Sequence, residues 1–369
     1  MAKTKHKKKV RGLQYFFIKD DIWKTLLKDN KVDSIYKSKV KQINFFRFIT
    51  KPFRMLQIAL FENKINKIDL SEKQPVFILG HWRSGTTHMH YVFDKDPQFG
   101  TLTNYQTFSF TTSLLSKRIV KFILAPLFPK ERTQDNMKMS PNKPGEEEQP
   151  LSVVSTRTGI HSWIFTKNRS YFDKYNLFKG ISKQEKEAWQ KDYMKVLKTI
   201  SFSNNEKQLL LKNPHNTSRV KELLELFPKA KFVFIHRHPL DVYISAVHLF
   251  AKVIETQFLQ YATLSERKEM IIYFFKTTLQ KYLAERDLIP EGNLYEISYD
   301  EFTGNEMEIT KDIYKKLGLG GFEEAQPHIK YYLDSVKKYE RNKFRNLSPE
   351  VEARLKKEWK FAFDEWDYE

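Results

Sequence analysis

The segment Phe77–Thr87, FILGHWRSGTT, has the spacing of an anion-binding loop between a strand and a helix. Gly80 and Gly85 are separated as in G-x-x-x-x-G-K-[S/T], the loop that cradles nucleoside triphosphates. Thr86 stands where that loop has its lysine, and Arg83 lies earlier in the turn. Backbone N–H groups, a guanidinium and hydroxyls all donate to anionic oxygen. The segment therefore predicts an anion site, but without the cation that triphosphate chemistry requires.

A second segment, HRHPLDVYISAV, has the residues for another anion site. Arg237 follows an apolar run, Pro239 suits the first turn of a helix, and Ser245 lies eight residues after Arg237. A strand-end arginine and a helix serine can together hold one phosphate. Taken alone, the pair is more typical of a surface arginine and an ordinary helix serine.

Candidates for a general base lie in SPNKPGEEEQPLSV, which contains Glu146, Glu147 and Glu148. Adjacent glutamates usually form a solvated charge run. One of them beside Lys212, in a site that excludes water, could accept a proton from a hydroxyl while Lys212 stabilises charge on a leaving phosphate. We rank Glu146 first and Glu148 second, and His215 in KNPHN is a rival below them.

Four short apolar runs predict the strands that must position these residues. They are residues 75–80, 208–212, 231–237 and 293–299, and longer helical patterns separate them. This rhythm predicts an α/β fold with a P-loop-like parallel sheet flanked by helices on both faces. Ligands collect at the carboxyl ends of such strands. The polar residues expected there are Arg83, Lys212, Arg237 and Tyr299.

The chain divides by charge into a basic helical N-terminal extension, residues 1–70, and an α/β domain, residues 71–369. The extension has 18 basic and 6 acidic residues, or +12 of the net charge of +19. Its aromatic-rich stretch, residues 43–65, predicts a helix laid across the core, with a lipid-contacting surface as the alternative. Pro52 is expected to open a second helix there.

Composition narrows the cellular setting. The chain has no cysteine, which excludes disulfides and thiolate metal sites and is compatible with a reducing compartment. The polybasic start, MAKTKHKKKVRGL, suits a solvated leader, a nucleic-acid contact or an anionic membrane surface. Neither a secretory signal nor a transmembrane helix is expected, because no suitable apolar run is present.

The two anion segments together resemble the bacterial branch of the sulfotransferase superfamily, which uses 3′-phosphoadenosine 5′-phosphosulfate (PAPS). GHWRSGTT is similar to the family's 5′-phosphosulfate loop, and FVFIHRHPLDVYIS to its 3′-phosphate element. LLLKNPHNTSRVKELLELFPKAKFVFIHRHP, LIPEGNLYEISYDEF and SVKKYERNKF match in order, so the resemblance runs from about Gln74 to the C-terminus.

The resemblance implies roles for individual residues. Those expected around the 5′-phosphosulfate are Arg83, Ser84, Gly85, Thr86 and Thr87, and those on the 3′-phosphate are Arg237 and Ser245. Tyr299 would frame the nucleotide, and a closing loop would include Lys338, Tyr339 and Asn342. No metal is expected, because a sulfuryl group carries less charge than a phosphoryl group.

The implied activity is in-line transfer of the sulfuryl group from PAPS to a hydroxyl acceptor, with a Glu or His base. Aromatic segments and the basic extension favour a hydrophobic alcohol such as a sterol or lipid, with a glycan or small phenol as alternatives. Two other classes compete: a nucleotide kinase with a degenerate P-loop, and a non-enzymatic basic protein that binds membranes or nucleic acid. The expected location is cytoplasmic, with peripheral contact of the extension at the anionic inner membrane face and no nucleic-acid partner.

Overall fold

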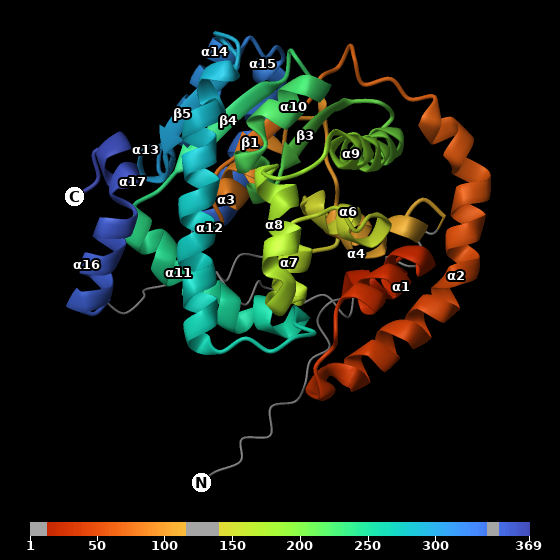
Figure 1. The fold of residues 1–369 in the computed structure, drawn as a ribbon. Coiled ribbons are helices and arrows are strands. Elements are labelled where there is room, and N and C mark those ends of the chain that lie inside the picture. The colour runs from red at the N-terminus through yellow and green to blue at the C-terminus, as the bar shows by residue number, and fades with distance from the viewer. Residues whose placement is uncertain (1–12, 116–139, 338–346) are drawn as a thin grey trace.

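A five-stranded parallel sheet forms the centre of the protein (Figure 1). The computed structural model describes residues 13–115, 140–337 and 347–369. The strands are β1 (Val76–Leu79), β2 (Phe99–Gly100), β3 (Gln208–Lys212), β4 (Lys231–His236) and β5 (Leu294–Ser298), in the spatial order β2-β3-β1-β4-β5. The four predicted runs are confirmed as strands. The edge strand β2, with two residues, is too short to show a periodic pattern and was missed.

Helices cover both faces of the sheet. One face carries α3 (Thr86–Phe93), α13 (Tyr299–Phe302), α14 (Glu306–Leu317) and α15 (Phe322–Val336). The other carries α9 (Lys183–Ser203), α10 (Val220–Leu226), α11 (Pro239–Lys252) and α12 (Leu264–Glu285). Successive strand side chains point to opposite faces. Val76 and Ile78 accordingly enter the first core, and Phe77 and Leu79 enter the second. The predicted fold class is confirmed.

The order of the strands brings the predicted anion elements to one edge of the sheet. β1 pairs with β3 on one side and β4 on the other. The chain leaves β1 through α3 on one face, and it leaves β3 and β4 through helices on the opposite face. Ligand sites of parallel sheets form where the connections diverge in this way. The loop after β1 lies at that point, between the loops after its two neighbours.

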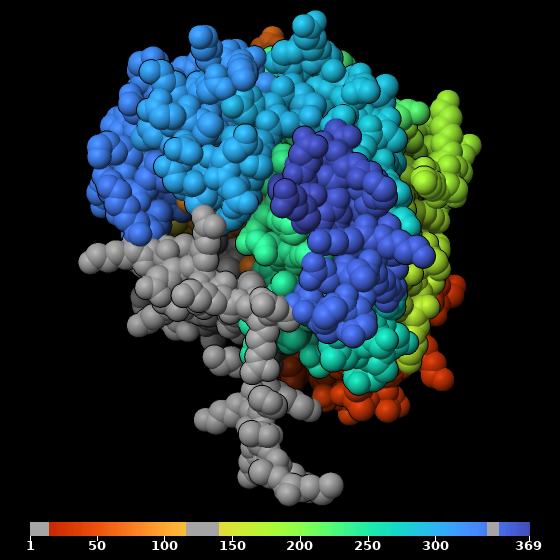
Figure 2. Space-filling view, turned by 90° about the vertical axis from the view of Figure 1, so that its left-hand side faces the viewer, coloured from red at the N-terminus to blue at the C-terminus, as the bar shows by residue number. Residues whose placement is uncertain are grey.

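Short elements connect this framework. They are α4 (Asn104–Ser109), α6 (Glu148–Val154), α7 (His161–Ile164), α8 (Arg169–Leu177) and the 3₁₀ helices η3 (Phe110–Thr112) and η6 (Pro214–Ser218). The C-terminal helices α16 (Pro349–Glu358) and α17 (Lys360–Glu365) pack beside α11 and α12 (Figure 2). Trp359 stacks on Phe275 of α12 with ring centroids 4.0 Å apart, and Trp366 stacks on His236 at 4.8 Å.

The N-terminal region packs into the second core, the one that contains Phe77 and Leu79. It comprises η1 (Leu13–Phe17), α1 (Asp20–Asp29) and α2 (Lys37–Asn66). Ile18, Trp23 and Ile43 are buried with residues of the α/β framework. Figure 1 shows α2 running along an outer edge of the protein. Among the helices of the described residues, none combines the length and apolar composition needed to cross a lipid bilayer.

The prediction that Pro52 opens a second helix is wrong, because α2 continues through it. A proline inside a helix removes one backbone donor and crowds the preceding turn. The carbonyl that loses its partner is that of Phe48, four residues before Pro52. The neighbouring Arg47 carbonyl accepts from Arg54 Nη1 at 2.9 Å and from Thr50 Oγ1 at 3.3 Å. Pro52 itself is exposed, so water can reach the turn that lacks a hydrogen bond.

Candidate active site

The loop between β1 and α3 has a backbone that depends on its glycines. Gly85, with φ of 101°, directly precedes α3, and a Cβ there would lie 2.3 Å from the Tyr299 ring. Arg83 also has a positive φ, 75°, which is uncommon outside glycine and is typical of functional turns. The loop is braced from within, because the buried Ser84 hydroxyl donates to the His81 carbonyl at 2.7 Å. Ser84 therefore uses its hydroxyl inside the turn.

The two predicted anion elements touch each other. Arg83 Nε donates a hydrogen bond to Ser245 Oγ at 2.8 Å. Ser245 lies in α11, whose first residue is Pro239 as predicted. The guanidinium from the loop after β1 and the hydroxyl from the helix after β4 thus occupy one place at the edge of the sheet.

Arg237 joins the same region through Tyr299. Its guanidinium carbon lies 4.6 Å from the centre of the Tyr299 ring, and that ring packs against Gly85. Arg237 Nη2 also donates to Asp241 Oδ2 at 2.7 Å. Its Nε is buried without a hydrogen-bond partner among the described residues. A buried donor of this kind is costly unless something accepts from it, so an anionic oxygen is a fitting partner.

Lys212, the last residue of β3, forms an ion pair with Glu146. The ammonium is almost fully buried, with 4% of its side chain exposed, whereas 29% of the Glu146 side chain is accessible. Lys212 Nζ also donates to Thr87 Oγ1, at 3.4 Å, in the first turn of α3. One cation therefore connects the anion loop to an accessible carboxylate.

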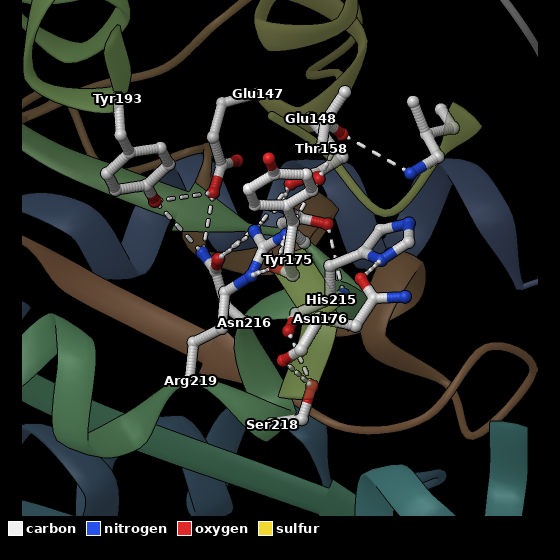
Figure 3. Close-up of polar contacts among 12 residues, drawn as sticks. Glu147, Glu148, Thr158, Tyr175, Asn176, Tyr193, His215, Asn216, Ser218 and Arg219 are labelled. Carbon is white, nitrogen blue, oxygen red and sulfur yellow. Dashed lines mark hydrogen bonds and ion pairs between the residues drawn. The ribbon is translucent and has the colours of Figure 1, made fainter. Parts of the chain in front are cut away.

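Glu147 and Glu148 point toward separate buried partners (Figure 3). Glu147 Oε1 accepts from Asn216 Nδ2 at 2.6 Å and from Tyr193 OH at 3.1 Å. Burial raises the pKa of Glu147 to about 7, because desolvation penalises its charged form more than these donors stabilise it.

Glu148 is fully occupied by donors. Arg219 holds it with two hydrogen bonds, Nη1 to Oε2 at 2.6 Å and Nη2 to Oε1 at 2.8 Å. Asn213 donates to Oε2 at 2.8 Å, and the Thr158 hydroxyl donates to Oε1. Burial alone would raise the pKa of Glu148, but the charge and hydrogen bonds of Arg219 hold it well below its ordinary value. Because donors occupy both of its carboxylate oxygens, this arrangement favours a structural role for Glu148, the second candidate for the general base.

His215 lies in η6, with its ring fixed by one hydrogen bond. Nδ1–H donates to Asn176 Oδ1 at 2.5 Å, so Nε2 carries the free lone pair. Nε2 is buried and has no hydrogen-bond partner among the described residues. Burial lowers the pKa of His215 to about 4, which leaves the ring uncharged at neutral pH.

Aromatic rings surround His215 on the side of the anion loop. Trp82 meets the imidazole edge to face with centroids 4.8 Å apart, and Trp163 lies 5.5 Å from it. Trp82 and Trp163 are 4.9 Å apart, and Phe274 of α12 lies 6.1 Å from Trp82. An apolar wall therefore adjoins His215 and the anion loop.

Several residues near the site carry no motif by which sequence could have identified them. Asn176 and Trp163 are the main examples, since Asn176 acts through His215, which is distant in the chain, and Trp163 is one ring among many. Tyr299, by contrast, is found at the end of β5 where it was predicted. The predicted closing-loop residues Lys338, Tyr339 and Asn342 lie outside the described residues.

Comparison with known proteins decides the family. A family model described as "Sulfotransferase family" matches residues 75–324. The chain belongs to the sulfotransferase family. This sulfotransferase is 26% identical over 325 residues to the omega-hydroxy-beta-dihydromenaquinone-9 sulfotransferase Stf3 of Mycobacterium bovis and of Mycobacterium tuberculosis, covering 88% of this chain and 83% of the relative.

Solved structures agree on the fold. The sulfotransferase superposes with STF1 from Mycobacterium tuberculosis H37Rv at a TM-score of 0.63 and 15% identity, over 92% of this chain and 89% of that one. STF9 from Mycobacterium avium gives a TM-score of 0.63 and 17% identity, over 96% and 97% of the two chains. The family model and the curated relatives show that the enzyme is a PAPS-dependent sulfotransferase, as predicted. The comparisons support neither the kinase nor the non-enzymatic alternative.

Proposed function

We propose that this sulfotransferase transfers the sulfuryl group of PAPS to the hydroxyl of a hydrophobic lipid alcohol, with Glu146 as the general base. The observation that carries the proposal is the buried Lys212, which contacts both Glu146 and Thr87. A carboxylate and a cation at the start of α3 are the two groups that proton removal and leaving-group stabilisation require.

The proposed donor site uses both anion elements. The N-terminal turn of α3, with Arg83, Thr86 and Thr87, would receive the 5′-phosphosulfate. Arg237 and Ser245 would receive the 3′-phosphate, supported by the unpartnered Nε of Arg237. Tyr299 contacts both Arg237 and Gly85, so it would lie between the two ends of the nucleotide.

The proposed reaction is an in-line displacement. The acceptor oxygen forms a bond to sulfur while the bond between sulfur and the phosphate oxygen breaks. The hydroxyl proton passes to the Glu146 carboxylate, and the electron pair of the broken bond stays on the leaving phosphate. Lys212 is placed to stabilise that added negative charge, and no residue needs to change its covalent state.

A lipid alcohol is favoured by two observations. The relatives that match over most of the chain are named as sulfotransferases of a hydroxylated menaquinone derivative, which is a lipid. In addition, the aromatic wall of Trp82, Trp163 and Phe274 adjoins the site. Such a wall can hold an apolar chain while its terminal hydroxyl reaches Glu146.

His215 is the second candidate for the base, because its buried Nε2 has a free lone pair and Asn176 fixes the tautomer. Measuring kcat for Glu146→Gln and His215→Gln on the same acceptor separates the two candidates. Glu146 as base predicts the larger loss in Glu146→Gln, roughly 10²-fold or more. A larger loss in His215→Gln, reproduced in part by Asn176→Ala, would transfer the role to His215.

The acceptor is tested by incubating the enzyme with ³⁵S-labelled PAPS and separate panels of isoprenoid alcohols, sterols, phenols and glycans. Label on an isoprenoid alcohol or a sterol, at a kcat/KM well above that for phenols and glycans, is the expected result. Preference for a phenol or a glycan would contradict the proposed acceptor class while leaving the sulfotransferase assignment intact.

A further inference from the structure

The outward face of α2 is apolar along most of its length. Phe48 and Met55 have 77% and 61% of their surface exposed. The other large apolar residues exposed on this helix are Phe45, Phe46, Ile49, Phe53, Leu56, Ile58 and Leu60. At 1.5 Å per residue, residues 45–60 form an apolar band roughly 22 Å long. Contiguous exposure on this scale marks an interaction surface rather than scattered surface residues.

The buried side of the same helix is partly polar. The helix therefore has the opposite arrangement to an ordinary surface helix, which buries its apolar side. Arg54 is buried and donates to Asp20 at 3.1 Å and to Thr50 Oγ1 at 2.6 Å. Gln57 is buried and donates to the Phe110 carbonyl at 3.1 Å, and its own carbonyl accepts from the Leu114 backbone at 2.8 Å. Rotating the helix to bury its apolar band would break these bonds. The band is therefore held on the outside.

Basic residues border the band. Lys37 and Lys41 precede it, Lys51 lies beside it, and Lys64 and Lys67 follow it. These five lysines are exposed, and α2 contains one acidic residue, Glu62. A helix with an apolar face between lysines fits the boundary of an anionic bilayer, with the rings among the acyl chains and the ammonium groups at the headgroups. The same charge disfavours α2 packing on a second copy of itself.

The helix also adjoins the segment that carries the candidate base. Gln57 bonds to Phe110 in η3, which directly follows α4. Thr107 of α4 lies against Gly145, since a Cβ on that glycine would be 2.1 Å from the Thr107 hydroxyl oxygen. Gly145 immediately precedes Glu146. Figure 1 shows α4 and α6 on the side of the protein that faces α1 and α2.

We propose that α2 docks this enzyme on an anionic membrane through the band of residues 45–60. The proposal rests on the proposed function, because a lipid acceptor has to be taken from a bilayer. Docking along α2 turns the region of α4 and the Glu146 loop toward the lipid. The acceptor chain then has a short route from the bilayer to the site.

The test is co-sedimentation of the full chain with vesicles of phosphatidylcholine alone and of phosphatidylcholine with 30% phosphatidylglycerol. The wild type is expected to bind the anionic vesicles and to lose binding in high salt. The triple variant Phe45→Ser/Phe48→Ser/Leu56→Ser is expected to bind these vesicles at least roughly tenfold more weakly than the wild type. A matched control, Leu264→Ser/Leu288→Ser/Tyr331→Ser, removes exposed apolar residues elsewhere and should bind as the wild type does.

Two further measurements keep the outcomes distinct. Binding of 3′,5′-bisphosphoadenosine to both triple variants checks that they fold, and turnover of geraniol, a short isoprenoid alcohol, checks chemistry without a bilayer. Docking by α2 predicts unchanged geraniol turnover but slower turnover of solanesol held in vesicles. Equal vesicle binding by the wild type and the α2 variant would overturn the docking proposal. It would also be overturned if the wild type formed a dimer that does not bind vesicles while the α2 variant were a monomer. No transfer to any alcohol would instead count against the proposed acceptor.

Discussion

Arg83 Nε donates to Ser245 Oγ at 2.8 Å, across 162 positions of the chain. This bond joins the turn after β1 to the helix after β4. With Tyr299 bridging Gly85 and Arg237, it gathers both predicted anion elements at one edge of the sheet. One nucleotide with anionic groups on both the 3′ and the 5′ position of its ribose can therefore reach both elements.

Replacing Arg237 should affect recognition of the 3′-phosphate alone. Arg237→Ala is expected to weaken the binding of 3′,5′-bisphosphoadenosine by roughly tenfold to a hundredfold, which is the contribution of a charge-assisted hydrogen bond to affinity. Affinity for adenosine 5′-monophosphate, which lacks that group, should change little. Isothermal titration with both ligands measures the difference, and Arg354→Ala on the exposed α16 is the control. Equal losses for the two ligands would place Arg237 elsewhere on the nucleotide.

Replacing Lys212 should slow the chemical step more than it weakens binding. Its ammonium is expected to act on charge that develops in the transition state, so Lys212→Met should lower kcat by about 10²-fold or more. The KM for PAPS should change far less. Steady-state kinetics at saturating acceptor measure both constants, with the partly exposed Lys95→Met, two residues after the end of α3, as the control. A rise in KM with unchanged kcat would make Lys212 a ground-state binding residue.

Breaking the Glu148–Arg219 pair should destabilise the fold. Glu148→Gln leaves a buried guanidinium without its counter-charge, which typically costs about 3–5 kcal/mol. Chemical denaturation measures the free energy of unfolding. Glu148→Leu combined with Arg219→Met should recover much of the loss, because an apolar pair removes both charges. If Glu148→Gln were as stable as the wild type but inactive, Glu148 would be catalytic after all.

Buried histidines should make the protein acid-sensitive. Burial lowers the pKa of His161 to about 4. The ring therefore stays neutral when folded, whereas the unfolded chain binds a proton below its ordinary pKa of about 6.5. The stability from this residue is present above that value and is lost as pH falls toward 4. Between pH 8 and 5.5 one such histidine lowers the free energy of unfolding by about 1.4 kcal/mol.

His161→Gln is the corresponding test. Glutamine can still donate to the Ser155 carbonyl, which lies 3.3 Å from His161 Nε2. Urea denaturation of both proteins at several pH values should show a shallower decline below pH 6.5 for the variant. Identical pH profiles would mean that His161 binds its proton equally well in both states.

Much of the framework could be predicted because local patterns determine it. The centres of the runs PVFILG and KFVFIHR, VFIL and FVFI, are apolar at every position, as strands covered on both faces must be. Pro239 and the Arg237-to-Ser245 spacing likewise depend only on neighbouring residues. The course of α2 through Pro52 could not be predicted, because the contacts that hold the helix beyond it, from Arg54 to Asp20 and from Gln57 to the Phe110 carbonyl, form only in the folded chain.

The different contacts of the three adjacent glutamates could not be predicted either. Glu146 contacts Lys212, Glu147 contacts Tyr193 and Asn216, and Glu148 contacts Arg219. Their partners come from β3, α9, η6 and the residue directly after η6. Consecutive side chains here point in different directions, so the fold, and not the run of charges, makes Glu146 the accessible carboxylate.

Transfer of ³⁵S from labelled PAPS to an isoprenoid alcohol tests the central claim most directly, comparing wild type, Arg83→Ala, Arg237→Ala and the double variant. Two adjoining anion elements that hold one donor predict reduced kcat/KM for PAPS in each single variant, and further loss in the double variant. Transfer at the wild-type rate in both single variants would contradict the account, because neither arginine would then bind the donor.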